Sequence, residues 1–397
     1  MNIIDDYLAY TVNSESPQAY HKWTCLSMVS SLIGKRCWIK FNYFTVYPNL
    51  YLILVSLPGL GKKSTALRIG SKMVEESKSE VLISKDGLSP QALMIDLDEA
   101  YRIVDTPSGK KFGSSSLTVF ASEIASLFGV GSGMVEFLTD IYDSDKSFEY
   151  KTKNSGKLTI KGPCLNLMAC TTTDTFSSKI LKDAVAGGLV SRSVVVFAND
   201  QKAISPFDMP PPEALEARQR VIERFAKIRD LFGEVVFTTE AKDYYETWYM
   251  KTFGDCQDKN TEFNSRKHVH VAKAAMLLAL SDLTTIIELK HVLYAIEMLN
   301  EVDHYMKLIH MASGASKYSE TILNIIATIN EYGRIVEEDI LTLFLGDSSL
   351  EDFEAQIELI MRAGYITLET EEENKVKKTY FNITPKGTEL FLNYQKA

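Results

Sequence analysis

The sequence predicts an α/β core followed by a mainly helical region and a small mixed C-terminal domain. Short apolar runs alternate with helical spacing over residues 49–200, and helical spacing dominates residues 201–312. Residues 313–397 contain three helical segments and then two strands that flank a charged turn. Residues 1–48 are expected to be a helical appendage that packs on the core.

The composition is that of an ordinary globular protein. The chain has 397 residues, of which 45% are hydrophobic and 24% charged, enough for two or three domains. No apolar run could span a bilayer, and acids stand near the N-terminus where a signal peptide carries bases, so we expect a cytoplasmic protein without a membrane partner. The five cysteines include no C-x-x-C pair, which argues against a zinc site or disulfide framework. A net charge of −9 excludes general coating of nucleic acid, so any such site must be local.

The clearest motif lies in YLILVSLPGLGKKSTALRIG, residues 51–70. An apolar strand, a glycine turn and a helix follow one another in the order of a phosphate-binding loop. Glycines let backbone amides approach phosphate oxygens, the helix N-terminus adds positive potential, a lysine reaches the terminal phosphates and a hydroxyl holds Mg²⁺. The candidate ATP contacts are Pro58, Gly59, Leu60, Gly61, Lys62, Lys63, Ser64 and Thr65.

The match to G-x-x-x-x-G-K-[ST] is imperfect and leaves two alignments. If Lys62 is the phosphate lysine, Ser56 replaces the first glycine and Lys63 replaces the hydroxyl. If Lys63 is, Ser64 supplies the Mg²⁺ hydroxyl and Lys62 replaces the last glycine. We favour Lys63 with Ser64, because Mg²⁺ chemistry needs a hydroxyl directly after the lysine. An ordinary glycine-rich turn is the alternative.

Two further strands end in candidate site residues. The strand before Ser122 and Glu123 reaches the position where P-loop ATPases carry an acidic pair, so Glu123 is the candidate to activate water. Its alternative role is a helix-start carboxylate. The strand that begins at Pro163 ends at Thr171 and Thr172, either of which could sense the γ-phosphate or simply form a turn.

Residues 148–160 read as a β-hairpin that is basic in an otherwise acidic protein. Its lysines are Lys151, Lys153, Lys157 and Lys161. They could hold a DNA backbone, or they could protect a solvated edge hairpin.

Two arginines are candidates for contacts with the nucleotide. Arg192 follows a glycine pair and precedes an apolar strand, a position that suits an arginine finger reaching a neighbouring subunit. Arg266, together with Lys273, could approach the nucleotide from a helical lid.

The tail has the outline of a winged-helix domain. Its middle helix, residues 350–363, is acidic, so protein contact is at least as well supported as reading of a DNA groove.

The order of these motifs resembles phage and prophage P-loop ATPases of the AAA+ type that are classed as replicative helicases. The resemblance covers roughly residues 1–310 and depends on the series YLILVSLPGLGKKST, VFASEIASLFG, KSFEYKTKNSGKLTIKGPCLNLMACTTTDTF, GGLVSRSVVVFA and SRKHVHVAKAAMLLAL. GGLVSRSVVVFA is also similar to the arginine-finger motif of MCM-type helicases. The chain departs from MCM proteins in its short N-terminal region, and no zinc site or primase domain is evident.

The resemblance implies a P-loop NTPase (AAA+-like) core with a helical lid and a C-terminal winged-helix domain. It implies Lys63 as the phosphate lysine, Arg192 as the finger, Arg266 as a lid sensor, and ATP and Mg²⁺ as cofactors. We expect an ATP-dependent DNA helicase or translocase of phage or mobile-element replication. It would form a homo-oligomer, most simply a hexamer, on single-stranded or forked DNA, with a primase or other replication proteins as partners. A helicase loader or replication initiator, and a non-hydrolysing nucleotide-bound adaptor, are the alternatives.

Overall fold

The computed structural model describes residues 2–77, 81–85, 89–128, 133–143, 147–152, 156–176, 188–198, 202–205, 207–253, 262–313, 319–344, 350–362, 364–373 and 376–395. The chain forms two compact units, Met1–Met306 and Lys307–Ala397. The first unit takes in nearly all of the regions 1–48, 49–200 and 201–312 that the sequence suggested separately. None of the helices in the described ranges is both long and apolar enough to cross a membrane.

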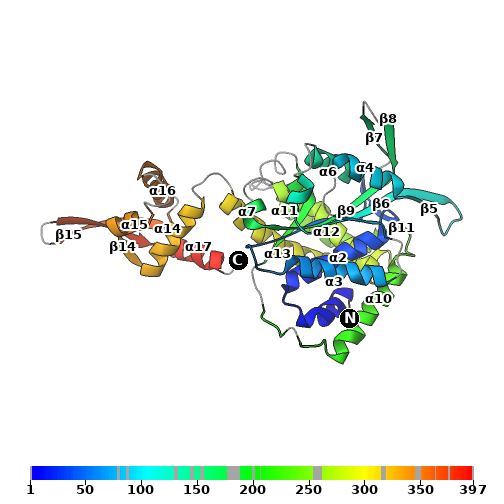
Figure 1. The fold of residues 1–397 in the computed structure, drawn as a ribbon, viewed down its shortest axis with the longest axis horizontal. Helices are drawn as coiled ribbons and strands as arrows, with labels where there is room; N and C mark the ends of the chain where they lie inside the picture. Colours follow the sequence, from blue (N-terminus) through cyan, green and yellow to red (C-terminus); the bar gives the residue numbers. More distant parts are fainter. Residues whose placement is uncertain are drawn as a thin grey trace. The chain divides into compact units, whose positions relative to one another are not determined.

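The first unit is built on a mainly parallel sheet of six strands, which confirms the α/β prediction (Figure 1). Its strand order is β10-β3-β9-β6-β4, and β5 pairs antiparallel with the first part of β6. The strands are β3 (Tyr51–Ser56), β4 (Ile83–Lys85), β5 (Tyr101–Asp105), β6 (Lys111–Ala121), β9 (Pro163–Thr172) and β10 (Ser193–Phe197). All six residues of β3 and all five of β10 are buried, as expected for parallel strands covered on both faces.

The N-terminal helices are part of the core and not an appendage. They are α1 (Ile3–Tyr10), the 3-10 turn η1 (Thr11–Asn13) and α2 (Gln18–Ile33). Thirteen of the sixteen residues of α2 are buried, and α2 packs on α3 (Lys63–Glu76) and on β3 and β9. Buried Thr and Ser side chains line α2 beside the apolar ones, so its sequence looks less apolar than its environment is.

Further helices cover the sheet. α4 (Pro90–Glu99), α5 (Ala125–Phe128), α6 (Met134–Tyr142), α7 (Thr173–Thr175) and α9 (Leu189–Arg192) connect its strands. Figure 1 places α6 on the other side of β9 from α2 and α3. Right-handed crossovers require this, because the path from β3 to β4 and the path from β6 back to β9 cross the sheet in opposite directions.

The expected helical region also belongs to this unit. It comprises α10 (Pro212–Ile228), α11 (Thr239–Phe253), α12 (Glu262–Ser281) and the first part of α13 (Leu289–Ser313). A short strand pair joins it to the N-terminal segment: β1 (Cys37–Lys40) pairs with β11 (Gly233–Glu234) and also with β2 (Thr45–Val46). Within the helical region, β12 (Val236–Phe237) pairs with β13 (Ile286–Ile287). α12 packs on α2, α9 and α10, so this region is not a separate lid.

One segment differs from what its sequence suggests. Residues 106–116 have the composition of a flexible turn, but β6 begins at Lys111, because the serine-rich stretch pairs with β5 on one side and β9 on the other. The basic hairpin forms as predicted, from β7 (Ser147–Thr152) and β8 (Gly156–Lys161). Residues 179–185, whose sequence predicts a short helix, lie outside the described residues.

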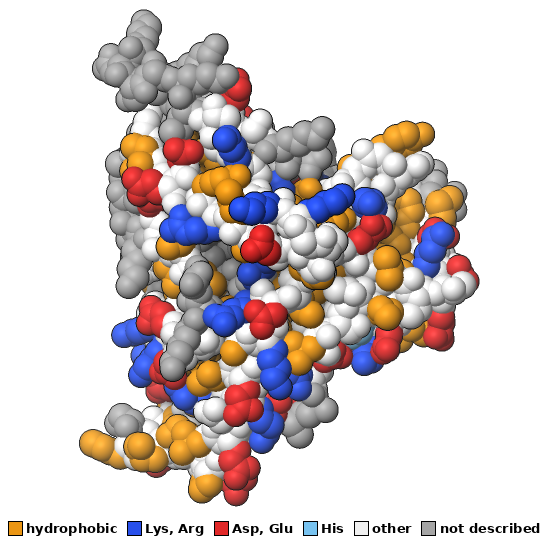
Figure 2. Space-filling model, turned by 90° about the vertical axis from the view of Figure 1, so that its right-hand side faces the viewer, with side chains coloured by type: hydrophobic (Ala, Val, Ile, Leu, Met, Phe, Trp, Pro, Cys, Tyr) orange, Lys and Arg blue, Asp and Glu red, His pale blue; other side chains and the backbone are white. Residues whose placement is uncertain are grey.

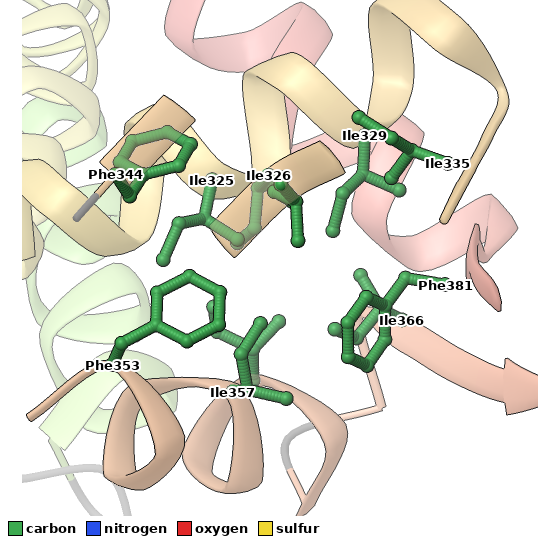
Figure 3. Packing of buried hydrophobic residues seen from close by; sticks show 11 residues of the cluster. Ile325, Ile326, Ile329, Ile335, Phe344, Phe353, Ile357, Ile366 and Phe381 are labelled. Carbon is green, nitrogen blue, oxygen red and sulfur yellow. The ribbon is translucent and has the colours of Figure 1, made fainter. Parts of the chain in front are cut away.

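The second unit has its own hydrophobic core. It contains α14 (Ser319–Tyr332), β14 (Arg334–Val336), α15 (Glu337–Phe344), α16 (Leu350–Arg362), β15 (Ile366–Glu373), β16 (Val376–Ile383) and α17 (Pro385–Gln395). Isoleucines of α14 meet Phe344, Phe353 and Phe381, which come from α15, α16 and β16 (Figure 3). β14 was not expected; it adds a third strand beside β16.

The α2–α3 contact gives a testable expectation. A Cβ atom built at Gly70 would lie 2.5 Å from Thr24 Cγ2 and 3.2 Å from the Tyr7 hydroxyl. Gly70→Ala should therefore lower the free energy of unfolding by about 1–2 kcal/mol, because overpacking outweighs the gain in helix propensity. Denaturant unfolding, with exposed Lys72→Ala as the control on the same helix, measures this. A more stable Gly70→Ala protein would mean that α2 does not pack tightly on α3.

Candidate nucleotide site

The loop after β3 leaves the sheet at the carboxyl ends of the parallel strands. Residues 57–60 are exposed, Gly59 and Gly61 have φ of 77° and 71°, and α3 begins at Lys63. A Cβ atom at Gly61 would lie 3.0 Å from Ser56 Cβ and 3.2 Å from the Tyr20 ring, so only glycine fits this turn. α3 follows this loop directly, and a helix N-terminus favours an anion, although the Thr65 amide already donates a 3.0 Å hydrogen bond to the Lys62 carbonyl.

The two adjacent lysines point in different directions. Lys63 is half-buried and turns back to β3, where its Nζ donates a hydrogen bond to Ser56 Oγ. Burial lowers the pKa of Lys63, while the negative potential of Cys170 and Glu123 opposes that shift. Lys62 is exposed, and its Nζ lies 3.8 Å from a Glu15 carboxylate oxygen. Lys63 is therefore the lysine that faces the interior of the loop.

Lys62 has a left-handed backbone, with φ 44° and ψ 41°, at the residue before α3. Side chains with a Cβ atom adopt this conformation at a cost, and glycine does so freely. Residue 62 therefore has the backbone conformation that glycine favours, although the residue there is a lysine. The Lys62 carbonyl accepts a hydrogen bond of 2.9 Å from Ser16 Oγ, which fixes the turn from the N-terminal segment.

Glu123 and Thr171 meet beside this loop. Thr171 Oγ1 donates a 3.0 Å hydrogen bond to Glu123 Oε1, and the Ile124 amide donates a 2.8 Å bond to the Cys170 carbonyl. Thr171 is fully buried at the end of β9. Thr172 instead caps α7, because its Oγ1 accepts a 3.3 Å bond from the Thr175 amide. Of the two threonines, Thr171 is the one bonded to the candidate catalytic carboxylate.

These residues share the edge of the sheet at which open α/β proteins bind ligands. β9 lies next to β3 in the sheet, but β4 and β6 come between them in the chain. The connection from β3 to β4 lies on one face of the sheet, and the connection from β6 to β9 lies on the other (Figure 1). The carboxyl ends of β3 and β9 are therefore the place where this kind of sheet is expected to bind a ligand. Lys63, Ser64, Glu123 and Thr171 all lie at this edge, with the Ser64 side chain exposed.

Arg192 and Arg266 lie at the opposite edge of the sheet. Arg192 directly precedes β10, whose first residue Ser193 pairs with Tyr51, the first residue of β3. At roughly 3.3 Å per residue, the six residues of β3 separate the two edges by about 17 Å. Arg266 lies with Arg192 and not beside Lys63 of the same chain, so the expected approach to its own nucleotide from a lid is not what the structure shows.

Asp143 holds the two arginines together. Arg192 Nε and Nη2 donate to Asp143 Oδ2 at 3.1 and 2.9 Å, and Arg266 Nη1 donates to Asp143 Oδ1 at 3.2 Å. Burial alone would raise the pKa of Asp143, but the hydrogen bond and charge of Arg266, with the charge of Arg192, bring it below its ordinary value. The carboxylate stays ionised and fixes both guanidinium groups.

Buried groups of α12 support this arrangement. Lys273 Nζ donates to the backbone and side-chain oxygens of Asn49 at 2.8 and 2.9 Å, and it lies 3.9 Å from the centre of the Tyr142 ring. Burial lowers the pKa of Lys273 to about 7, although Asp143 opposes the shift. His270 Nε2 lies 2.9 Å from the Ser191 carbonyl, and burial lowers the pKa of His270 to about 3, so its ring is neutral. Lys273 therefore braces the strand start and does not approach the loop.

The hairpin lysines are only partly described. Lys153 lies outside the described residues, and Lys151 pairs with Lys157 across the backbone of the hairpin. Lys161 is exposed, with its Nζ 5.8 Å from the centre of the Tyr101 ring. On the face seen in Figure 2, the coloured Lys and Arg side chains are interspersed with acidic and apolar ones, as the net charge of −9 suggests.

Sequence reasoning missed Asp143, Asn49 and the Ser56 hydroxyl. Asp143 stands in an acidic run with nothing to distinguish it, and its partners lie 49 and 123 residues away. The sequence placed Ser56 at the first-glycine position of the alternative alignment, but nothing there indicated that its hydroxyl accepts a hydrogen bond from Lys63. No protein-family model matches this chain, and no curated protein matches its sequence.

The strained backbone at Lys62 can be tested by stability. Lys62→Gly should raise the free energy of unfolding by a few tenths to about 1 kcal/mol, because glycine relieves the left-handed conformation and an exposed ion pair contributes little. The matched variant Lys63→Gly should lower it by about 1 kcal/mol, since Lys63 is helical. Thermal and urea unfolding of both proteins give the comparison; equal losses in both variants would be inconsistent with strain at Lys62.

Proposed function

We propose that this chain is an ATPase that moves along DNA as a ring of identical subunits, acting as a helicase in the replication of a phage or other mobile element. The observation that carries the proposal is the separation of the candidate residues between two edges of one sheet. Lys63, Glu123 and Thr171 meet at the carboxyl edge, whereas Arg192 lies at the amino edge. This separation supports a hydrolytic site that a second copy of the chain would complete.

The loop after β3 suits a nucleoside triphosphate. Its two glycines and the first turn of α3 offer backbone amides, and Lys63 can leave Ser56 to meet the terminal phosphates. Ser64 is exposed in that first turn and would hold Mg²⁺ through its hydroxyl. Among the described residues, no group of three or more His, Cys, Asp or Glu side chains could hold a metal. Mg²⁺ commonly binds through substrate phosphates and water with few protein ligands.

Glu123 is the residue that would act on water. Its carboxylate is within reach of the Lys63 charge, and the buried Thr171 hydroxyl fixes one of its oxygens. The other oxygen can orient a water molecule in line with the γ-phosphorus and accept its proton as the new P–O bond forms and the bond to the β-phosphate oxygen breaks. Thr171 would thus position Glu123 and respond to what occupies the loop.

Arg192 and Arg266 would serve the nucleotide of a neighbouring subunit. About 17 Å of β3 separates Arg192 from the loop of its own chain, so a contact with the γ-phosphate requires another copy. Closed rings arise when one surface of a subunit packs head-to-tail on a different surface of the next. Asp143 keeps both guanidinium groups ordered for that contact, where they would stabilise charge on the transferring phosphoryl group.

Contact with DNA is assigned to the hairpin and, less directly, to the second unit. The hairpin carries Lys151, Lys153, Lys157 and Lys161 beside one acid, Glu149. The second unit has the helix and ribbon order of a winged helix, but Glu337, Glu354 and Glu358 border a groove between α15 and α16. Acidic side chains repel a phosphate backbone, so this domain would contact protein or use the ribbon.

The catalytic assignment gives a direct kinetic test. Glu123→Gln should keep ATP binding and lose turnover by on the order of 10²–10⁴-fold, because the amide cannot accept the proton from water. Lys63→Ala should lose turnover by a larger factor than Lys62→Ala, because only Lys63 faces the loop. Steady-state phosphate release with saturating Mg²⁺ measures all three. A larger loss from Lys62→Ala would overturn the alignment, and turnover unchanged in Glu123→Gln would remove Glu123 from the mechanism.

Mixing two inactive proteins tests the role of Arg192. Arg192→Ala alone should lose turnover by on the order of 10³-fold or more, as for other arginine fingers. Adding the Lys63→Ala protein should restore part of it, because some interfaces then combine an intact Lys63 from one chain with an intact Arg192 from the next. Lys63→Ala mixed with Glu123→Gln is the control, since both changes affect the same site; Arg192→Ala and Lys63→Ala mixtures without recovery would contradict the shared site.

Movement on DNA separates the proposal from its alternatives. A helicase should displace a strand from forked DNA with ATP and fail to do so as Glu123→Gln. A loader or initiator would hydrolyse ATP without displacing the strand. A nucleotide-bound adaptor would bind ATP and show no turnover that Glu123→Gln could remove; the Thr171–Glu123 hydrogen bond and the ordered Arg192 argue against it.

A further inference from the structure

A cavity lies at the amino edge of the sheet, remote from the candidate nucleotide loop. It has a volume of about 340 Å³, within the range of small-ligand sites. Its wall is formed by the end of α2, the start of β4, β5, the first half of β6 and the residues after α10. β6 contributes Ser114, Ser116 and Thr118 here, whereas Glu123 follows the opposite end of that strand. The two sites are therefore separate.

Arg36 lines this cavity and has a buried side-chain N–H group with no hydrogen-bond partner among the described residues. Its Nη2 donates to the Leu32 carbonyl at the end of α2, but its Nε is buried and has no hydrogen-bond partner within the described structure. Burial lowers the pKa of Arg36, since the charged form loses water, and the potential of Asp230 only partly opposes this. A buried guanidinium N–H without an acceptor costs free energy. An anion bound at the Arg36 side chain, which lines the cavity, would offset part of the cost of burying this charge.

The surrounding charges also favour an anion. The lining includes three arginines, Arg36, Arg102 and Arg229, and one acid, Asp230. Arg229 Nε lies 3.6 Å from Asp230, whereas Arg102 donates to the Glu99 and Tyr101 carbonyls at 2.7 and 2.9 Å. Within the described ranges, neither Arg36 nor Arg102 has an ion pair with an acidic side chain. The three positive charges less one negative charge leave a net charge of +2 in the lining.

The other residues of the wall indicate what kind of molecule would bear the anionic group. Leu32, Ile33, Leu82, Ala100 and Val104 give an apolar side, and the hydroxyls of β6 give a polar one. A site with apolar walls and a few convergent polar groups is typical of pockets for small organic ligands. Arginine forks suit the oxygen geometry of a phosphate group.

We propose that this cavity binds a small phosphate monoester of mononucleotide size, with its phosphate on Arg36 and Arg102 and its apolar body against the aliphatic side chains of α2 and β5. The ligand chemistry is an anionic head on a flat or apolar body. A nucleoside monophosphate has that chemistry, and free inorganic phosphate shares only the head.

Titration calorimetry with AMP tests the proposal on the whole chain. The Lys63→Ala protein is used, so that the candidate loop after β3 does not contribute. AMP should bind, inorganic phosphate should compete with it more weakly, and adenosine should bind at least about tenfold less tightly than AMP, because it lacks the charged head. Arg36→Gln and Arg102→Gln should each weaken AMP binding by about tenfold or more.

Two further variants keep the test independent of folding and charge. Val104→Trp fills the cavity without changing its charge and should abolish AMP binding, while Arg68→Gln removes an exposed arginine on α3 and should leave it unchanged. Arg102 is exposed on β5, so its substitution should not unfold the protein. Absence of AMP binding, adenosine binding as tight as AMP, or equal losses in Arg68→Gln and Arg102→Gln would each overturn the proposal. ATP binding by the unaltered chain is a separate measurement, so failure here leaves the proposed ATPase function untouched.

Discussion

The parallel pairing of β3 with β9 on one side and β10 on the other sets the positions of Ser56, Thr171 and Arg192. Parallel strands bring their carboxyl ends to one edge, so Ser56, Thr171 and the loop before α3 meet there. The same pairing places the residue before β10 at the other edge, where Arg192 contacts Asp143. The parallel pairing of these strands therefore brings the candidate hydrolytic residues to one edge of the sheet. It places Arg192, the arginine expected to assist them, at the other edge.

The helices hold this arrangement from both faces. α2 buries most of its residues against α3, β3 and β9, and it supplies Tyr20, whose hydroxyl donates to the Val55 and Ala198 carbonyls at 2.5 and 2.8 Å. Those two carbonyls lie at the ends of β3 and β10, so Tyr20 ties the loop strand to its neighbour. On the other edge, Lys273 of α12 anchors Asn49 just before β3. The N-terminal and helical regions therefore belong to the same packed core as the sheet.

Much of the fold was predictable because its signals are local. The apolar run of β3, the two glycines and the helical spacing of α3 lie within twenty residues, and β6, β9 and β10 are equally plain apolar runs. The start of β6 was not predictable, because its serines resemble a turn until β5 and β9 are known to pair with them. The choice of Lys63 over Lys62 came from the chemistry of the adjacent hydroxyl and stays a prediction. The structure adds that Lys63 contacts Ser56, whereas Lys62 lies beside Glu15. The Arg192–Asp143–Arg266 cluster could not be predicted, because its members are far apart in the sequence and meet only through the fold of α6, α9 and α12.

The proposed function depends on the loop between β3 and α3 binding the phosphates of ATP through Lys63. Equilibrium binding of ATP with Mg²⁺ to the whole chain tests this without requiring turnover, oligomer formation or DNA. We expect the unaltered and Thr171→Ala proteins to bind ATP with similar affinity, and Lys63→Ala to bind it at least about tenfold more weakly, because a charge-assisted contact is lost. No detectable ATP binding by the unaltered chain, or the same affinity in Lys63→Ala, would contradict it.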